Sequence, residues 1–159
     1  MTPQGRPHAS RVAHDHAVLL VDDDVASREA LTAVLEACGC VVCEAADGQE
    51  ALAQLAEGYR PCAIFLDLMM PRLDGWQFRE MQRRDPELAR LPVALLSAAT
   101  NLRQHQERLA ADAAFAKPVT DLDDVIAFVE DHCDEAPAAV TITSGPDRAA
   151  RASSPRSRP

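Results

Sequence analysis

Four short apolar runs in this chain are each followed directly by polar side chains that could do chemistry together. The polar residues are Asp22, Asp23, Asp24, Asp67, Ser97 and Lys117. If the runs are parallel strands of one sheet, these side chains meet outside the carboxyl ends of the strands, where open α/β sheets bind ligands. Lys117 is the only lysine among 16 basic residues, and the other 15 are arginines. A single lysine at this position therefore indicates that the site needs a compact point charge.

This set of side chains suits the transfer of a phosphoryl group to a carboxylate. Converging carboxylates repel one another, and a hard divalent cation such as Mg²⁺, which prefers oxygen ligands, removes that repulsion. Asp67 can then act as the nucleophile and form an aspartyl phosphate. The Ser97 hydroxyl and the Lys117 ammonium would each donate to a phosphoryl oxygen. Each residue alone also fits a helix cap or a turn, so the hypothesis depends on their joint placement.

The apolar pattern predicts strands alternating with helices over residues 17–133. The expected strands are 17–21, 41–43, 63–66, 93–96 and 113–116, and the expected helices lie near 25–38, 51–57, 76–81, 101–110 and 122–129. Asp24 is the expected cap of the first helix, and the helical spacing counts Cys38 and Met81 as buried positions. This alternation predicts an α/β fold with a parallel sheet and helices on both faces.

Composition excludes several other classes of protein. The chain has 159 residues and a net charge of −9, and residues 17–133 alone hold 21 acidic and ten basic residues, which disfavours nucleic acid as the main partner. No apolar run approaches the ~20 residues that a membrane span needs, and no signal-peptide stretch begins the sequence. We therefore expect a cytoplasmic protein without membrane attachment. Residues 1–16 and 134–159, which are polar and rich in proline, are predicted to be disordered.

The cysteines and the first histidines give no predicted metal site. Five cysteines without a regular framework favour reduced thiols over a secreted disulfide scaffold. Cys38, Cys40 and Cys43 lie close together, but no second Cys or His pair with ligand spacing is near them, so zinc is not expected there. His14 and His16 fall in the expected N-terminal tail, where specific metal binding is not expected either.

Four segments resemble the receiver domain of two-component response regulators, in a stand-alone form like the chemotaxis regulators. They are Val18-Leu-Leu-Val-Asp-Asp-Asp24, Ile64-Phe-Leu-Asp-Leu-Met-Met-Pro-Arg-Leu-Asp-Gly75, Pro92-Val-Ala-Leu-Leu-Ser-Ala98 and Phe115-Ala-Lys-Pro118. Their order and spacing extend the resemblance over residues 17–133. The resemblance implies a flavodoxin-like, doubly wound fold with a five-stranded parallel sheet in the order 2-1-3-4-5 and five helices.

The resemblance also implies the roles of the acidic residues. Asp67 would accept a phosphoryl group from a histidine kinase or a phosphotransfer protein in a phosphorelay. Asp22 and Asp23 would form an acid pair that binds Mg²⁺ together with Asp67, with Asp23 as the more direct ligand. The backbone carbonyl of Met69 would be a further ligand.

The remaining implied roles concern the last two strands. Ser97 would fill the switch hydroxyl position, and Lys117 would contact the phosphoryl group and be joined to Pro118 by a cis peptide bond. Ala114 stands three residues before the lysine, where the family usually has an aromatic switch residue, and an alanine cannot fill the space behind Ser97. Either Phe115 takes that place through an altered register, or the response relies on loop movement.

Three functions fit these expectations. The first is a signalling protein, not an enzyme, that acts on an unknown downstream protein by contact, since the 26 residues after Cys133 are too few and too polar for a DNA-binding or catalytic module. The second is a receiver with the same chemistry that serves as a phosphate sink or inhibits a kinase. The third is a phosphohydrolase with an aspartyl-phosphate intermediate, which would want a second acid two residues after Asp67, where Met69 stands.

Overall fold

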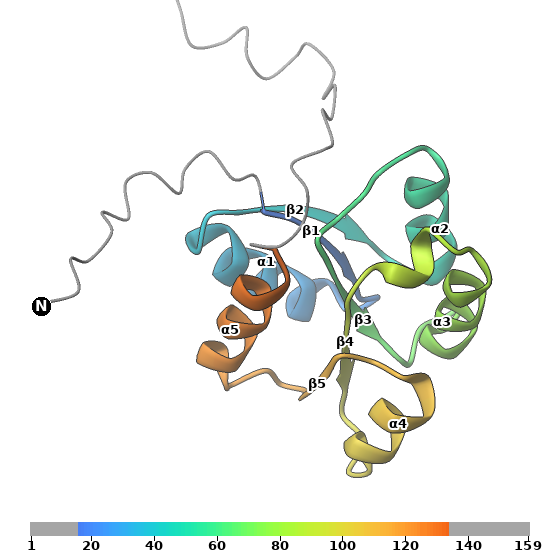
Figure 1. The fold of residues 1–159 in the computed structure, drawn as a ribbon. Helices are drawn as coiled ribbons and strands as arrows, with labels where there is room; N and C mark the ends of the chain where they lie inside the picture. The colour runs from blue at the N-terminus through green and yellow to red at the C-terminus, as the bar shows by residue number, and fades with distance from the viewer. Residues whose placement is uncertain (1–15, 134–159) are drawn as a thin grey trace, which may run out of the picture.

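A computed structural model describes residues 16–133 as alternating strands and helices (Figure 1). The strands are β1 (His16–Val21), β2 (Cys40–Ala45), β3 (Ala63–Asp67), β4 (Val93–Ser97) and β5 (Ala113–Ala116). The helices are α1 (Val25–Ala37), α2 (Gly48–Ala56), α3 (Gly75–Arg84), α4 (Leu102–Leu109) and α5 (Leu122–Cys133), with a short 3-10 helix, η2 (Leu88–Arg90). The predictions for the two tails lie outside the described residues, except that β1 already begins at His16.

The sheet has the predicted topology. Its order is β2-β1-β3-β4-β5, and each neighbouring pair is parallel. From β1, which lies inside the sheet, the chain passes to β2 at one edge and then returns to β3 on the other side of β1. In open α/β sheets, ligands bind at such a reversal of strand order, which here lies at the carboxyl ends of β1 and β3.

The sheet buries apolar side chains on both of its faces. Because successive strand residues point to opposite faces, Val18 and Leu20 of β1 pack with α1 and α5, whereas Leu19 and Val21 pack with α2, α3 and α4. All four side chains are fully buried. Figure 1 shows α1 and α5 side by side on one face of the sheet and α2 and α3 on the other. A two-sided core of this kind explains why the central strands read as continuous apolar runs.

Local side chains set where the helices begin. The Asp24 carboxylate caps α1 by accepting from the N–H of Ala26 at 3.2 Å, as the sequence predicts. Asp74 and Gln77 form a reciprocal capping box at the start of α3. Two positions that helical spacing marked as buried are exposed, namely Cys38, which lies beyond the last turn of α1, and Met81.

The expectation that all cysteines are reduced is wrong. Cys62 and Cys133 form a disulfide across a sequence separation of 71 residues. Their pairing depends on the fold, which brings the residue before β3 next to the end of α5, so no spacing along the chain reveals it. Cys38, Cys40 and Cys43 are free thiols. Within residues 16–133, no cluster of metal-ligating side chains includes any of these three.

None of the helices within residues 16–133 has the length and apolar character that a bilayer crossing requires.

Candidate functional site

The carboxyl ends of β1, β3 and β5 bring charged side chains together. Carboxylate oxygens of Asp22, Asp23 and Asp67 all lie within 4.8 Å of one another. The ammonium nitrogen Nζ of Lys117 lies 2.9 Å from Oδ2 of Asp22 and 3.3 Å from Oδ2 of Asp67. Residues from three separate strand ends, up to 95 positions apart in the chain, therefore meet in one cluster.

Asp67 is the most perturbed acid of this cluster. It is 4% exposed at the end of β3, and its Oδ1 accepts from the N–H of Met69 at 3.2 Å. Burial raises the pKa of Asp67 to about 6, because the Met69 N–H and the Lys117 charge only partly offset the loss of solvent and the Asp22 charge adds repulsion. Because few water molecules reach this carboxylate, little solvent competes with a further cation, and the approach of such a cation is favourable.

Lys117 is held between two carboxylates. Burial alone would lower its pKa, but the hydrogen bond to Asp22 and the charges of Asp67 and Asp22 outweigh burial, so the pKa of Lys117 is raised. The lysine therefore keeps its positive charge at neutral pH. The peptide bond between Lys117 and Pro118 is cis, as predicted.

Ser97 ends β4, between the strands that carry Asp67 and Lys117. It is 2% exposed, and its Oγ accepts from the N–H of Ala99 at 3.1 Å. Its backbone carbonyl accepts from the N–H of Lys117 at 3.0 Å, so the end of β4 is hydrogen-bonded to the residue that directly follows β5. A hydroxyl oxygen that accepts one hydrogen bond can still donate its own proton to a ligand.

The segment between β3 and α3 packs tightly against the end of β3. The Met69 side chain is 75% exposed, and its N–H contacts Asp67, whereas the role of its carbonyl as a metal ligand stays a prediction. Gly75 begins α3 with no room for a side chain, since a Cβ there would lie 2.4 Å from the carbonyl oxygen of Asp67 and 2.7 Å from Cα of Leu68. The absence of a side chain at Gly75 therefore lets α3 start directly beside the end of β3.

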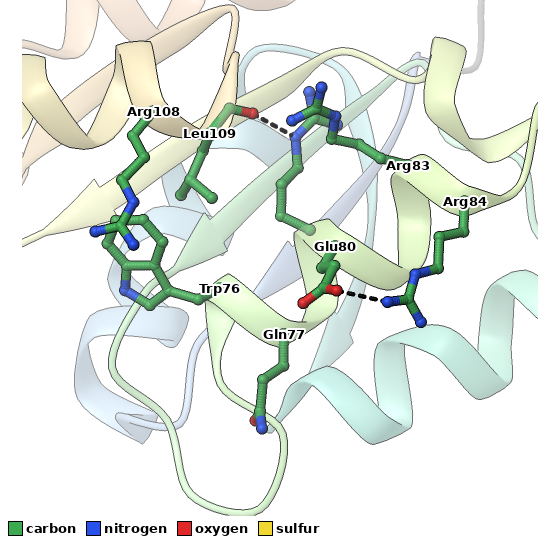
Figure 2. Close-up of a pocket in the computed structure, with 8 residues that line it drawn as sticks. Trp76, Gln77, Glu80, Arg83, Arg84, Arg108 and Leu109 are labelled. Carbon is green, nitrogen blue, oxygen red and sulfur yellow. Dashed lines mark hydrogen bonds and ion pairs between the residues drawn. The ribbon is translucent and has the colours of Figure 1, made fainter.

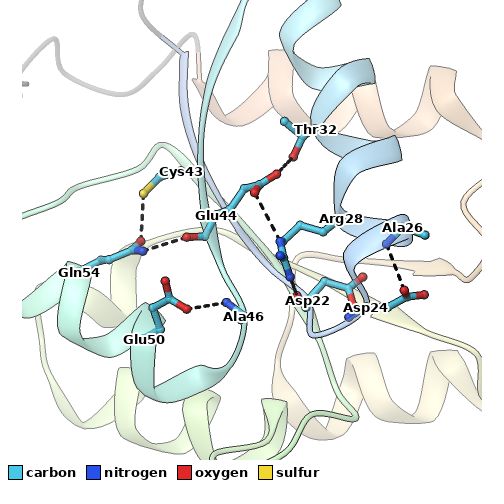
Figure 3. A network of polar contacts seen from close by, with 10 residues as sticks. All are labelled: Asp22, Asp24, Ala26, Arg28, Thr32, Cys43, Glu44, Ala46, Glu50 and Gln54. Atoms are coloured by element: carbon cyan, nitrogen blue, oxygen red, sulfur yellow. Dashed lines mark hydrogen bonds and ion pairs between the residues drawn. The ribbon is translucent and has the colours of Figure 1, made fainter. Parts of the chain in front are cut away.

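Arg28 supports the acidic cluster from α1 and was not found by sequence reasoning. Its Nη1 donates to the backbone carbonyl of Asp22 at 2.6 Å, and its Nε donates to Oε2 of Glu44 at 3.4 Å (Figure 3). The Thr32 hydroxyl donates to the other oxygen of Glu44 at 2.5 Å. This network fixes the backbone between β1 and α1. Helical spacing puts Arg28 and Thr32 on one face of α1, but only the sheet order reveals that Glu44 lies opposite them.

Asp47 anchors the β3–α3 segment from the other side and was also missed. It is 3% exposed, caps α2 through the N–H of Glu50, and forms an ion pair of 3.1 Å with Nε of Arg72. The N–H of Gly48 donates to the carbonyl of Leu73 at 3.0 Å. The start of α2 therefore holds the segment that follows Asp67, although the contacting residues are 25 positions apart in the sequence.

The structure excludes an altered register that would put Phe115 in the place of the switch aromatic. Ala114 pairs with Leu95 and Phe115 with Leu96 in a regular parallel ladder. The Phe115 ring lies 6.2 Å from that of Phe65 and 6.3 Å from that of Phe128, on the side of the sheet that α1 and α5 cover. Ala114 packs on the opposite side. The position that usually carries the aromatic side chain therefore holds only a methyl group.

A surface pocket between α3 and the end of α4 holds none of the predicted site residues. Figure 2 shows Arg108 stacked on Trp76, with its Cζ 5.0 Å from the ring centroid, and Arg83 and Arg84 along α3. Arg79 also lines this pocket, although it is largely buried, and its Nε donates to the carbonyl of Leu109 at 3.1 Å. The pocket is thus built by contacts that join α3 to α4, and we assign it no part in the chemistry of the acidic cluster.

Comparison with known proteins gives a consistent match. The family described as the response regulator receiver domain matches residues 18–130. Protein PilG of Pseudomonas aeruginosa is 38% identical over 85 residues, which cover 54% of this chain and 62% of PilG. Response regulator MprA of Mycolicibacterium vanbaalenii is 40% identical over 97 residues, which cover 60% of this chain and 40% of MprA. The matched part therefore spans about half the length of these relatives.

Solved structures with the same fold include three receiver proteins. The chemotaxis protein CheY4 of Vibrio cholerae has a TM-score of 0.64 at 28% identity, covering 73% of this chain and 97% of CheY4. A response regulator receiver protein from Pseudomonas putida has a TM-score of 0.67 at 28% identity, covering 75% and 98%. The receiver domain of a sensor histidine kinase from Pseudomonas aeruginosa, with a TM-score of 0.66 at 26% identity and coverage of 75% and 98%, has a magnesium ion coordinated in its active site cleft.

Proposed function

This chain belongs to the response regulator receiver domain family, and we propose that Asp67 is its phosphoacceptor, which takes a phosphoryl group from a histidine kinase or a phosphotransfer protein. The observation that carries the proposal is the position of Lys117, whose Nζ bridges Asp22 at 2.9 Å and Asp67 at 3.3 Å. A retained ammonium beside a desolvated carboxylate can hold the oxygens of an incoming phosphoryl group. The resulting signal passes to a downstream protein by contact.

The chain's own side chains supply most of the proposed chemistry. An oxygen of the Asp67 carboxylate attacks the phosphorus of a phosphohistidine, the phosphorus–nitrogen bond breaks, and the imidazole leaves and takes up a proton, so that an acyl phosphate forms. Lys117 stays bound to Asp22 and turns its charge from Asp67 toward a phosphoryl oxygen. The Ser97 hydroxyl, which ends the strand between the other two, donates to another oxygen.

The acidic cluster fits a magnesium ion. Three carboxylates face one ammonium, so the site holds more negative than positive charge. Burial, which raises the pKa of Asp67, adds to the need for a further cation when this carboxylate is ionised. Asp22 and Asp67 are buried, whereas Asp23 is exposed and can reach a partly hydrated ion. We propose Asp22, Asp23, Asp67 and the Met69 carbonyl as the residues that would hold it. When bound, Mg²⁺ would neutralise charge on the phosphoryl oxygens.

The proposed response to phosphorylation uses loops rather than an aromatic switch. Ala114 has no ring to move, and Phe115 is committed to packing on Phe65 and Phe128. The loops after β3 and β4 begin at the two residues that would contact the phosphoryl group, Asp67 and Ser97. We infer that contact of these loops with a partner carries the signal.

The proposal is tested by incubating the whole chain with Mg²⁺ and acetyl phosphate and by measuring its intact mass. We expect one phosphoryl group on the wild type and on the control Glu29→Gln, an exposed acid on α1, and none on Asp67→Asn. A phosphohistidine phosphotransfer protein is the second donor. Absence of an adduct with both donors, or an undiminished adduct on Asp67→Asn, contradicts the proposal. Repeated turnover of p-nitrophenyl phosphate would favour a phosphohydrolase instead.

A further inference from the structure

A second cluster of metal-ligating side chains lies at the opposite ends of the same two central strands. His16 begins β1, Cys62 directly precedes β3, and Cys133 is the last residue of α5. Each of the three has one ligand atom within 4.8 Å of those of the other two. The N–H of Cys62 donates to the carbonyl of Ala17 at 2.7 Å, which fixes this cysteine beside the start of β1.

This cluster is separate from the acidic cluster and differs from it in chemistry. β1 has six residues and runs from His16 to the residue before Asp22, so a rise of about 3.3 Å per residue puts the two clusters about 20 Å apart. One cluster offers only carboxylate oxygens, which suit Mg²⁺. The other offers two sulfurs and an imidazole nitrogen, which suit zinc and similar softer cations.

We propose that His16, Cys62 and Cys133 form a redox-controlled site for Zn²⁺. In the disulfide form, both sulfurs are bonded to each other and the site binds no cation. A dithiol reductant delivers two electrons and two protons to the disulfide, giving two thiols, and is itself converted to a disulfide. When the sulfurs bind Zn²⁺, the two thiols release two protons, His16 binds through a neutral ring nitrogen, and water fills the fourth position.

The size and surroundings of the cluster agree with this assignment. Zinc–sulfur bonds of about 2.3 Å in a tetrahedral site put ligand atoms about 4 Å apart. The two sulfurs, which are bonded to each other in this structure, must therefore separate after reduction, while the ring nitrogen of His16 already lies within 4.8 Å of both. Cys133 is buried, and Cys62 packs against the core beneath α1 and α5. Such a water-poor setting favours a cation that binds thiolates over free, charged sulfurs.

Both the disulfide and the zinc form would hold the end of α5 against the sheet. The reduced form without a cation keeps that end in place by packing alone. The site would therefore let α5 respond to the thiol state and the zinc supply of its surroundings, independently of Asp67.

Cobalt(II) is a suitable probe, because its bonds to thiolates give a charge-transfer absorption that carboxylates do not give. The whole chain is titrated with Co²⁺ after reduction and, separately, after oxidation, with excess Mg²⁺ present to occupy the acidic cluster. We expect one equivalent of Co²⁺ with thiolate absorption in the reduced protein, its displacement by one equivalent of Zn²⁺, and no such absorption in the oxidised protein.

Variants identify the ligands. Cys133→Ser should lose the thiolate absorption of a two-sulfur site, and His16→Ala, which keeps both cysteines, should weaken binding at least about tenfold. Cys38→Ser, at an exposed free cysteine, is the matched control and should bind as the wild type does. Circular dichroism establishes that each variant is folded.

Three outcomes would overturn the inference. Reduced wild type without thiolate absorption would show that the cluster does not bind such a cation, whatever the variants do. Absorption that persists unchanged in both Cys133→Ser and His16→Ala would place the ligands elsewhere. Loss of absorption in Cys38→Ser would assign the site to the three cysteines near β2 instead.

Discussion

Replacing the proposed phosphoacceptor should make the protein more stable at neutral pH. The variant is Asp67→Asn, in which a neutral amide of nearly the same shape takes the place of a buried carboxylate. The amide oxygen can still accept from the N–H of Met69, and Lys117 keeps its contact of 2.9 Å with Asp22. The change therefore removes the charge of Asp67 and the hydrogen bond that its Oδ2 accepts from Nζ of Lys117 at 3.3 Å.

The size of the effect follows from the pKa of Asp67, which folding raises from 3.8 to about 6. A carboxyl group whose pKa is raised in the folded state favours folding when it is protonated, and this contribution is lost as the pH rises from 3.8 through 6. Since one pKa unit corresponds to about 1.4 kcal/mol, the ionised Asp67 lowers the free energy of unfolding by about 3 kcal/mol above pH 7. Asp67→Asn should recover about 3 kcal/mol at pH 8 but only about half of that at pH 5.

Urea unfolding, followed by the fluorescence of the single tryptophan, Trp76, measures this difference. The wild type, Asp67→Asn and the control Glu29→Gln are compared at pH 8 and pH 5 in buffer with a chelator. The control should stay within about 0.5 kcal/mol of the wild type at both pH values. Added Mg²⁺ should narrow the gap, because a cation that binds the folded state stabilises the protein that holds it more tightly.

The reasoning would be refuted if Asp67→Asn were no more stable than the wild type at pH 8 without metal ions. A gain of equal size at pH 8 and pH 5 would also refute it, because that result would mean that the ionisation of Asp67 does not set the gain. A parallel gain in Glu29→Gln would point to the net charge of the chain rather than to this site.

Three further predictions concern the residues around Asp67. Lys117→Ala should raise the pKa of Asp67 further, so the pH at which acetyl phosphate labelling is half-maximal should move upward, whereas Arg90→Ala, at an exposed arginine, should leave it unchanged. Gly75→Ala should lower the free energy of unfolding by about 1–3 kcal/mol and reduce labelling, because the new Cβ would meet the Asp67 carbonyl. The control Gly58→Ala, which is strained only by its φ of 105°, should lower the free energy of unfolding by about 1 kcal/mol and leave labelling intact. Phe115→Ala should cost about 2 kcal/mol in urea unfolding yet leave the rate of labelling unchanged, and a large loss of labelling would contradict the assignment of Phe115 to packing alone.

The sheet and its strand ends could be predicted from the sequence because their signals are local. A strand buried on both faces needs an unbroken apolar run, and the polar residue that follows it marks the point where the chain leaves the core. Asp67, Ser97 and Lys117 stand at such points, so the fold class alone brings them to one edge. The roles expected of these residues came from their order and spacing along the chain, through the resemblance to the receiver domain.

Other parts of the structure depend on contacts that no local pattern encodes. Arg28 and Glu44 face each other only because β2 lies beside β1, and Asp47 reaches Arg72 only because α2 starts next to the segment after β3. The disulfide between Cys62 and Cys133 likewise depends on how α5 packs. Cys38 was expected on a buried face because helical spacing does not show where α1 ends.

The run of three aspartates after β1 shows how one local sequence can serve three physical purposes. Asp22 still lies in the core at 1% exposure, where its carboxylate binds Lys117 and accepts from the N–H of Asp24 at 2.9 Å. Asp24 directly precedes α1 and caps it. Asp23 is left between strand and helix and is exposed, so its charge is the one best able to meet a hydrated cation. Moving the run one residue toward the N-terminus would bury a charge in the place of Val21 and remove the cap, and moving it one residue toward the C-terminus would remove the acid that binds Lys117. We infer that the position of the strand end, rather than the number of carboxylates, suits this site to the proposed metal ion.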